Sequence, residues 1–333
     1  MASPFKIPVV DVYTSHGRPD RFTLKGRAAL MSPQQLDESP KGRLAQLKQN
    51  LRRLRVSELV HRVVRVHVLD RVVDVDTDNE GHFEVDVAGV HVAPGFAPVS
   101  AQVLDRGGQP IEPRSAGYVQ IIGTHAQYAV VSDVDDTVLV SQVLSKVRLA
   151  LRTFVPGVAD MDATPGMAPL YQKLARLGPE RPGFFYLSGS PVNLHRKLAA
   201  FLELNGFPRG SLILKKLGVR SVLPRRVASW IPDALLNPAD ALAGSFEFKV
   251  TQLHGLMTEL PDLRFILIGD SGEDDPEIYQ RFAADPALGP RVAAIYIREA
   301  GRLERKPNFP GQLWFSEAAQ VSADLRARDL TAR

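Results

Sequence analysis

The chain has 333 residues, of which 44% are hydrophobic and 23% charged, an ordinary composition for a globular protein with room for two domains. It contains no cysteine, which excludes disulfides, thiolate metal ligands and a cysteine nucleophile. The formal net charge of +4 favours anionic partners without identifying one, and no nucleic-acid partner is expected. No run of about 18 apolar residues and no signal-peptide pattern occurs, so we expect a cytoplasmic protein.

The first 30 residues and the segment after residue 40 have different patterns. Val9–Tyr13 and Phe22–Leu30 are rich in β-forming residues and predict two strands around a turn at Ser15–Pro19. In residues 41–55, leucines recur at helical spacing among arginines and lysines, which predicts a basic amphipathic helix. Such a helix usually covers a domain core, and peripheral contact with an anionic membrane is the alternative.

The sequence up to residue 123 continues with short β-type segments. The expected strands are Val63–Val68, Val72–Asp76, His82–Val87, Val99–Leu104 and Tyr118–Ile122. Acidic residues from Asp74 to Glu80 suggest a calcium-binding loop, but Val87 stands where that loop needs a bidentate glutamate. We therefore expect residues 1–123 to form a β-sandwich-like domain without a catalytic site.

Residues 128–143 join an apolar, β-branched strand to three acidic residues in the string Asp-Val-Asp-Asp-Thr. A turn that begins at Asp135 would let Asp133 and Asp135 point into one pocket. Two carboxylates so close repel each other unless a cation lies between them, and hard oxygen ligands suit Mg²⁺. A strand that simply ends in an acidic turn is the plainer alternative, but the complete string favours a functional site.

This string resembles the first motif, D-x-D-x-T/V, of the haloacid-dehalogenase-like phosphohydrolases. The wider sequence Val-Ser-Asp-Val-Asp-Asp-Thr-Val, together with the later motifs, resembles the phosphatidate phosphatase family of the actin-patch type. The resemblance implies that Asp133 is the nucleophile and Asp135 a general acid and base. Asp136 has no role that chemistry alone assigns, and orienting the loop or simple solvation both stay open.

From residue 128 onward, apolar strands alternate with helical stretches, which predicts an α/β fold with a mainly parallel sheet. The resemblance implies a haloacid-dehalogenase-like layered phosphatase domain over residues 124–333. Active sites in such sheets lie at the carboxyl ends of the strands. We therefore expect the catalytic residues at the carboxyl ends of the strands.

The strand Gly183–Leu187 ends in Ser-Gly-Ser-Pro. Ser190 before Pro191 predicts the N-cap of a helix that runs to about residue 204, so capping and phosphate contact both stay open for Ser190. The string Phe-Phe-Tyr-Leu-Ser-Gly-Ser-Pro resembles the second motif of the family. This resemblance implies that Ser188 hydrogen-bonds the transferring phosphoryl group.

Two more motifs follow along the chain. Lys249 begins a predicted helix, where a lysine usually faces solvent, but the resemblance implies a third-motif lysine that offsets clustered acidic charge. The strand Phe265–Ile268 ends in Gly-Asp-Ser-Gly-Glu-Asp-Asp-Pro-Glu-Ile-Tyr, which resembles the fourth motif. Asp270 then becomes a Mg²⁺ ligand. Asp274 and Asp275 both fit as the second acid, and the family string favours Asp275.

Together these motifs predict a Mg²⁺-dependent phosphomonoester hydrolase that forms an aspartyl-phosphate. The predicted metal ligands are Asp133, Asp135, Asp270 and Asp275, and the predicted phosphate-binding residues are Thr137, Ser188, Gly189 and Lys249. The expected substrate is phosphatidate or a related lipid, and a soluble phosphoester is the alternative. A non-catalytic lipid-binding scaffold is the alternative from another class. Residues 214–244, rich in lysine and arginine, predict either a surface excursion or a lid for anionic head groups.

Overall fold

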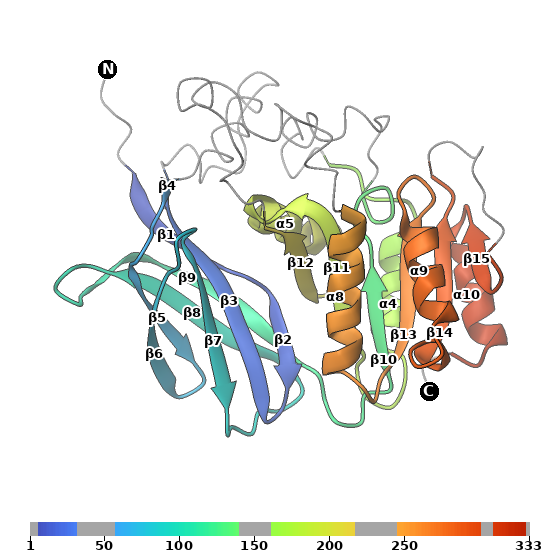
Figure 1. The fold of residues 1–333 in the computed structure, drawn as a ribbon, viewed down its shortest axis with the longest axis horizontal. Helices are drawn as coiled ribbons and strands as arrows, with labels where there is room; N and C mark the ends of the chain where they lie inside the picture. Colours follow the sequence, from blue (N-terminus) through green and yellow to red (C-terminus); the bar gives the residue numbers. More distant parts are fainter. Residues whose placement is uncertain (1–5, 32–56, 140–160, 217–244, 301–308, 331–333) are drawn as a thin grey trace, which may run out of the picture. The chain divides into compact units, whose positions relative to one another are not determined.

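The computed structural model describes residues 6–31, 57–139, 161–216, 245–300 and 309–330, and the chain divides into two compact units, Met1–Thr124 and His125–Arg333 (Figure 1). The basic helix predicted at residues 41–55 lies outside the described residues. So does the predicted lid, apart from residues 214–216. None of the helices in the described ranges has the length and apolar character needed to cross a membrane.

The first unit is a β-sheet of nine strands joined by hydrogen bonds. The strands are β1 (Ile7–Val12), β2 (Ser15–Arg18), β3 (Arg21–Met31), β4 (Ser57–Glu58), β5 (Val63–Val68), β6 (Arg71–Asp76), β7 (His82–Ala88), β8 (Gly95–Leu104) and β9 (Pro110–Ile121). Their order is β1-β3-β2-β9-β8-β5-β6, and β4 and β7 also pair with β3. The β-rich character is as predicted, whereas the packing of two separate sheets into a β-sandwich stays a prediction.

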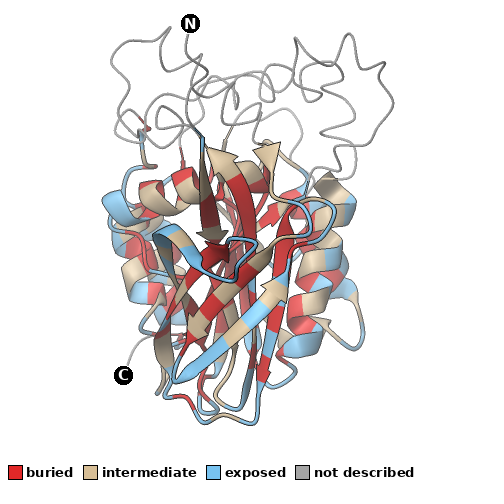
Figure 2. Cartoon of the chain, turned by 90° about the vertical axis from the view of Figure 1, so that its left-hand side faces the viewer, coloured by how far each residue is buried: buried red, intermediate tan, exposed pale blue. Residues whose placement is uncertain are grey.

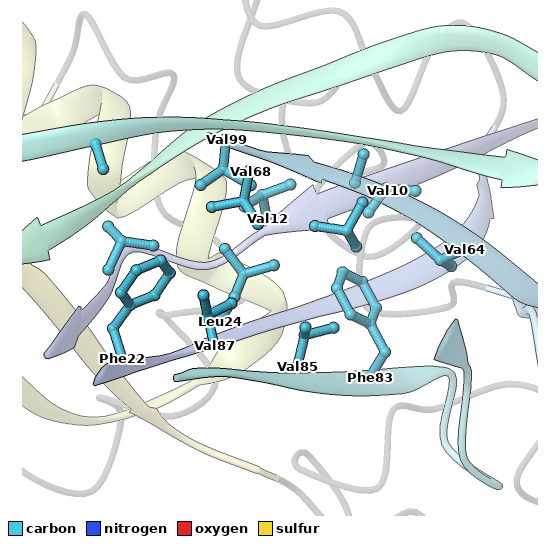
Figure 3. Close-up of a cluster of buried hydrophobic side chains, with 14 of the residues drawn as sticks. Val10, Val12, Phe22, Leu24, Val64, Val68, Phe83, Val85, Val87 and Val99 are labelled. Carbon is cyan, nitrogen blue, oxygen red and sulfur yellow. The ribbon is translucent and has the colours of Figure 1, made fainter. Parts of the chain in front are cut away.

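The core of this unit is built from alternate residues of its strands, because successive side chains of a strand point to opposite faces. Figure 2 shows buried and exposed positions alternating along these strands. In β7, Phe83, Val85 and Val87 are buried and meet Leu24 of β3 in one apolar cluster (Figure 3). Gly26 of β3 makes room for this cluster, since a Cβ there would lie 2.3 Å from the Phe83 ring.

One local prediction in this unit is wrong. Ser15–Pro19 was expected to be a turn, but Ser15–Arg18 forms β2, which pairs with β3 and, in parallel, with β9. The connection to β3 is therefore only Pro19 and Asp20. Gly17 permits so tight a hairpin, because a Cβ on Gly17 would lie 2.3 Å from the Cβ of Phe22.

The second unit contains a six-stranded sheet in which every neighbouring pair is parallel, in the order β12-β11-β10-β13-β14-β15. Its strands are β10 (Tyr128–Ser132), β11 (Gly183–Pro191), β12 (Ser211–Lys215), β13 (Arg264–Asp270), β14 (Val292–Arg298) and β15 (Gln312–Phe315). Its helices are α4 (Met167–Leu174), α5 (His195–Leu204), α8 (Ser245–Glu259), α9 (Asp275–Ala284) and α10 (Ala318–Ala327), with short 3₁₀ turns η2 (Val192–Leu194) and η3 (Gly289–Arg291). The predicted α/β fold with a parallel sheet is confirmed.

The middle of this sheet is apolar on both faces, as expected for a parallel sheet covered by helices. Residues 129–131 of β10 and 265–268 of β13 are fully buried. Helix α8 contacts α9, and α4 contacts α10. Because all strands run the same way, the carboxyl ends of β10, β11 and β13 meet at one edge of the sheet, where the predicted motifs begin.

The predicted N-cap at Ser190 is wrong. β11 continues through Pro191, a 3₁₀ turn follows, and α5 begins only at His195 without a side-chain cap. The register of β11 against β12 shifts between Ser188 and Pro191, so the strand extends past the point where the Ser-Pro pair suggested a helix start. Ser190 therefore does not cap a helix, and its hydroxyl hydrogen-bonds to Asp135 instead.

Candidate active site

The loop after β10 is a compact buried turn. The backbone N–H of Asp133 donates to the carbonyl of Ile268 at 2.8 Å, and the N–H groups of Val138 and Leu139 both donate to the carbonyl of Val134. Asp136 has a positive φ of 57° and is buried, and its backbone carbonyl accepts a hydrogen bond from the Arg298 guanidinium. Asp136 therefore helps to turn the loop and is not a solvated surface residue.

Lys249, in the second turn of α8, lies at the centre of the site and not in solvent. Its Nζ donates to Asp133 Oδ1 at 2.7 Å and to Asp275 Oδ1 at 2.6 Å, and all three side chains are almost completely buried. A third contact joins Nζ to Glu273 Oε2 at 3.1 Å. One helix thus delivers a single positive charge to carboxylates that follow two different strands.

The acidic side chains of the site carry more charge than Lys249 can balance. Burial raises the pKa of Asp133 well above its ordinary value, and Lys249 opposes this shift while the neighbouring carboxylates add to it. Burial and the charge of Asp275 raise the pKa of Asp270 in the same way. Burial alone would lower the pKa of Lys249, but attraction by Asp133, Asp275 and Glu273 raises it overall, so the lysine stays charged.

This cluster meets the requirements of a divalent cation site. Asp133, Asp270 and Asp275 each offer a carboxylate oxygen, and these atoms all lie within 4.8 Å of one another. Carboxylate oxygens are the ligands that Mg²⁺ prefers, so these three residues would hold the ion. Asp133 Oδ2 and Asp270 Oδ2 are buried without a hydrogen-bond partner among the described residues, which is costly unless a cation or ligand occupies the space beside them.

Asp135 belongs to a neighbouring group of polar side chains. Its Oδ2 accepts hydrogen bonds from Ser188 Oγ at 2.8 Å and from Ser190 Oγ at 3.2 Å. Ser188 Oγ in turn accepts the N–H of Ser190 at 2.9 Å. Asp135 is not one of the three residues of the acidic group, and its predicted role as a metal ligand stays a prediction.

The remaining predicted phosphate-binding residues lie at the same edge of the sheet. Thr137 is completely buried, and its Oγ1 has no hydrogen-bond partner in the described ranges, so its hydroxyl can donate a hydrogen bond to a phosphoryl oxygen of a ligand. Gly189 packs against the start of α8, where a Cβ on it would lie 2.4 Å from Ser245 Oγ. A side chain at position 189 would therefore force the Ser245 hydroxyl to move at the start of the helix that carries Lys249.

The structure distinguishes the two candidates for the second acid of the fourth motif. Asp274 is exposed just before α9, whereas Asp275 is fully buried beside Lys249. Asp275 Oδ2 also accepts the N–H of Asp270 at 3.2 Å. Gly269 allows this close approach, since a Cβ there would lie 2.4 Å from Asp275 Oδ2.

Two residues of the site were not predicted from the sequence. Glu273 contacts Lys249, and Arg298 at the end of β14 contacts the backbone of the Asp136 turn. Glu273 stands inside the fourth-motif string, but the other acidic residues of that string made it indistinguishable from a solvated residue. Arg298 is far from the first motif in sequence, and only the order of the strands brings it close.

The fold and the site together define the class of this domain. The parallel sheet bears a buried carboxylate beside a lysine and further acids at the carboxyl ends of its strands, the residue types that the sequence motifs predict for a phosphatase catalytic domain. Residues 128–299 match the family described as the catalytic domain of phosphatidate phosphatase APP1. This match spans slightly more than half of the chain, and the chain belongs to that family.

Individual relatives are more distant. Phosphatidate phosphatase APP1 of Saccharomyces cerevisiae is 27% identical over 186 residues, which cover 55% of this chain and 27% of the yeast protein. An uncharacterized protein of Schizosaccharomyces pombe is 25% identical over 171 residues, which cover 51% of this chain and 25% of that protein. The chain thus spans about a quarter of the length of these curated relatives.

Two solved structures that match the chain resemble it only weakly. A carbohydrate acetylesterase from Xanthomonas citri has a TM-score of 0.30 at 11% identity, with 98% of this chain and 75% of that chain covered. A CARDB domain from Pyrococcus furiosus has a TM-score of 0.21 at 12% identity, with 36% of this chain and 97% of that chain covered. TM-scores this low do not identify a shared fold.

Proposed function

We propose that this protein hydrolyses a phosphomonoester through an aspartyl-phosphate on Asp133, with a divalent cation, most simply Mg²⁺, as cofactor. The observation that carries the proposal is the environment of the Asp133 carboxylate. Its Oδ1 is fixed by Lys249 at 2.7 Å, while its Oδ2 is buried without a partner among the described residues. One oxygen is thus held in place and the other is available to react.

The proposed reaction has two steps. An Asp133 carboxylate oxygen attacks phosphorus, and the bond from phosphorus to the alkoxy oxygen breaks as Asp135 donates a proton to that oxygen. Asp135 then removes a proton from water, whose oxygen attacks the aspartyl-phosphate. The bond between phosphorus and Asp133 breaks, inorganic phosphate leaves, and both carboxyl groups return to their starting states.

Each neighbouring side chain has a task in this scheme. Ser188 and Ser190 hold the Asp135 carboxylate through Oδ2, which fixes the direction in which its proton is delivered. Thr137 offers its buried hydroxyl to a non-bridging phosphoryl oxygen. Asp133, Asp270 and Asp275 would hold the cation, which supplies positive charge that the single Lys249 ammonium does not.

For the substrate, we propose a phosphorylated lipid of the phosphatidate class. The support is membership in a family described by phosphatidate phosphatase and the similarity to the yeast enzyme of that name. The soluble phosphoester predicted as an alternative shares the same phosphoryl chemistry. The two differ only in what surrounds the phosphate, so the experiment must compare them directly.

The test measures phosphate release from phosphatidate in mixed micelles and from a water-soluble phosphomonoester, with Mg²⁺ and with excess chelator. We expect hydrolysis only with the cation, faster for phosphatidate. Asp133→Asn is expected to lower kcat by at least about 10³-fold. Asp274→Asn is the matched control, because Asp274 is exposed beside the buried Asp275, and its activity should stay within about twofold.

The outcomes separate the parts of the proposal. Full activity in excess chelator would refute the cation, and full activity of Asp133→Asn would refute the nucleophile. Mass spectrometry of acid-quenched protein should find phosphate on Asp133 in the wild type and not in the variant. Faster turnover of the soluble ester would favour the soluble-substrate alternative, and no hydrolysis of either would favour a non-catalytic scaffold.

A further inference from the structure

The Lys249 ammonium already uses all of its hydrogen-bond donors. An ammonium group has three N–H donors. In this site Nζ contacts Asp133 Oδ1 at 2.7 Å, Asp275 Oδ1 at 2.6 Å and Glu273 Oε2 at 3.1 Å. A phosphoryl oxygen that binds to Lys249 must therefore take the place of one of these three carboxylate oxygens.

The three carboxylates differ in how readily they can leave. Asp133 and Asp275 have fully buried side chains, and releasing either would leave an unpaired charge in the interior. Glu273 makes the longest contact, and 15% of its side chain is exposed. It also lies between β13 and α9 and belongs to neither element, and segments outside regular elements open more readily than strands and helices. Glu273 is therefore the carboxylate that a phosphoryl oxygen can displace from Lys249.

We propose that Glu273 occupies the substrate's place on Lys249 in the free protein and is displaced by the incoming phosphoryl group. This inference rests on the proposed phosphohydrolase function and makes Glu273 a specificity-determining residue. An anion binds to Lys249 only if it competes successfully with a carboxylate. A phosphomonoester dianion competes with the Glu273 carboxylate more strongly than a singly charged phosphodiester does. Glu273 therefore favours monoesters over diesters.

The test is the binding of inorganic phosphate to the full chain in the presence of Mg²⁺, measured by titration calorimetry. Glu273→Gln preserves the size of the side chain and removes the competing charge. We expect phosphate to bind about tenfold more tightly to this variant. Steady-state kinetics should show a matching fall in KM for a soluble phosphomonoester and stronger inhibition by phosphate, because both anions compete with the same carboxylate.

Glu277→Gln is the matched control. Glu277 is exposed on α9, four residues from Glu273, and its substitution removes the same charge from the same neighbourhood. Phosphate affinity should change by less than about twofold in this variant, because solvent screens an exposed charge. Equal tightening in both variants would show a general effect of net charge and would overturn the inference.

The other outcomes are also decisive. Unchanged or weaker phosphate binding to Glu273→Gln, in a wild-type protein that hydrolyses phosphomonoesters, would overturn the inference and leave the proposed function intact. If Glu273→Gln does not fold, Glu273→Asp replaces it, because the shorter side chain keeps the charge and withdraws it from Lys249, and tighter binding is again expected. A wild-type protein that neither binds phosphate nor hydrolyses a phosphomonoester would overturn the proposed function and this inference with it.

Discussion

Lys249 supplies the positive charge that faces Asp133, Asp275 and Glu273. Replacing it with methionine keeps a long apolar stem but leaves three carboxylates without their shared ammonium. We expect Lys249→Met to lower the free energy of unfolding by about 3 to 5 kcal/mol in cation-free buffer, measured by urea denaturation. The loss should be smaller at acidic pH, because protonation of the carboxylates removes the repulsion.

The control for this prediction is Lys173→Met. Lys173 is exposed on α4, and removing its charge should change the free energy of unfolding by no more than about 0.5 kcal/mol. If Lys249→Met is as stable as Lys173→Met at neutral pH, then Lys249 does not neutralise the acidic cluster in the way its contacts indicate.

The raised pKa values of Asp133 and Asp270 predict how cation binding depends on pH. Burial and mutual repulsion make the folded protein bind protons at these carboxyls more tightly than the unfolded chain, whose aspartates titrate near 3.8. The stability of the cation-free protein should therefore fall as pH rises through the raised values. Mg²⁺ competes with these protons, so the rise in Tm caused by Mg²⁺ should be largest at neutral pH.

The measurement is Tm by calorimetry with Mg²⁺ and with chelator over a series of pH values. The Mg²⁺-dependent difference should shrink on acidification while the pH is still above the ordinary range of aspartate. In Asp270→Asn the difference should be small at every pH. A wild-type difference that does not change between neutral and mildly acidic pH would contradict this account of the cluster.

The approach of α9 to β13 depends on glycine at position 269. A Cβ there would lie 2.4 Å from Asp275 Oδ2 and 2.6 Å from Asp275 Cβ, so Gly269→Ala should displace the first turn of α9. We expect a loss of stability of about 1 to 3 kcal/mol and a loss of Mg²⁺ affinity, measured by urea denaturation and calorimetric titration.

Gly255→Ala provides the matched control for Gly269→Ala. Gly255 lies inside α8, and a Cβ on it would meet nothing within 4 Å. The same substitution should therefore stabilise the protein by about 0.5 to 1 kcal/mol and leave Mg²⁺ affinity unchanged. If Gly269→Ala also binds Mg²⁺ normally, Asp275 is not among the groups that hold the cation.

The chain as a whole is expected to behave as two domains joined near residue 124. β9 pairs with β8 up to Ile121, and the Ile122 N–H and the Gly123 carbonyl also form hydrogen bonds, so the chain is protected up to residue 123. Thr124 and His125 are exposed where the two compact units meet in sequence. Limited proteolysis with a protease of broad specificity should cleave between residues 123 and 127, as identified by mass spectrometry.

The fragment that begins near residue 125 should keep its hydrolytic activity, since every described residue assigned to the site lies beyond that point. Loss of activity at the same rate as cleavage would mean that the first unit is needed for the site. Survival of the 123–127 peptide at protease levels that digest the rest of the chain would contradict the division into two domains.

The strands of the parallel sheet were predicted correctly from the sequence, whereas a turn and a helix cap were not. The parallel sheet was predictable because strands buried on both faces leave long apolar runs, such as those of β10 and β13. The functional residues at their ends were also predictable, because charged residues directly after a buried strand are costly to bury unless they bind a partner. The Ser15–Pro19 turn and the Ser190 cap were mispredicted, because turn-forming residues and a Ser-Pro pair indicate local preferences that strand pairing can override.

The sequence by itself therefore determined the order of the four motifs and the family, and it predicted the kind of reaction. Tertiary structure decided which acids meet. Asp274 and Asp275 are neighbours of the same type in the chain, and only the approach of α9 to Gly269 buries one and exposes the other. Glu273 and Arg298 entered the site for the same reason: the contacts of Glu273 with Lys249 and of Arg298 with the Asp136 turn join elements distant in the chain, and no local pattern encodes such distances.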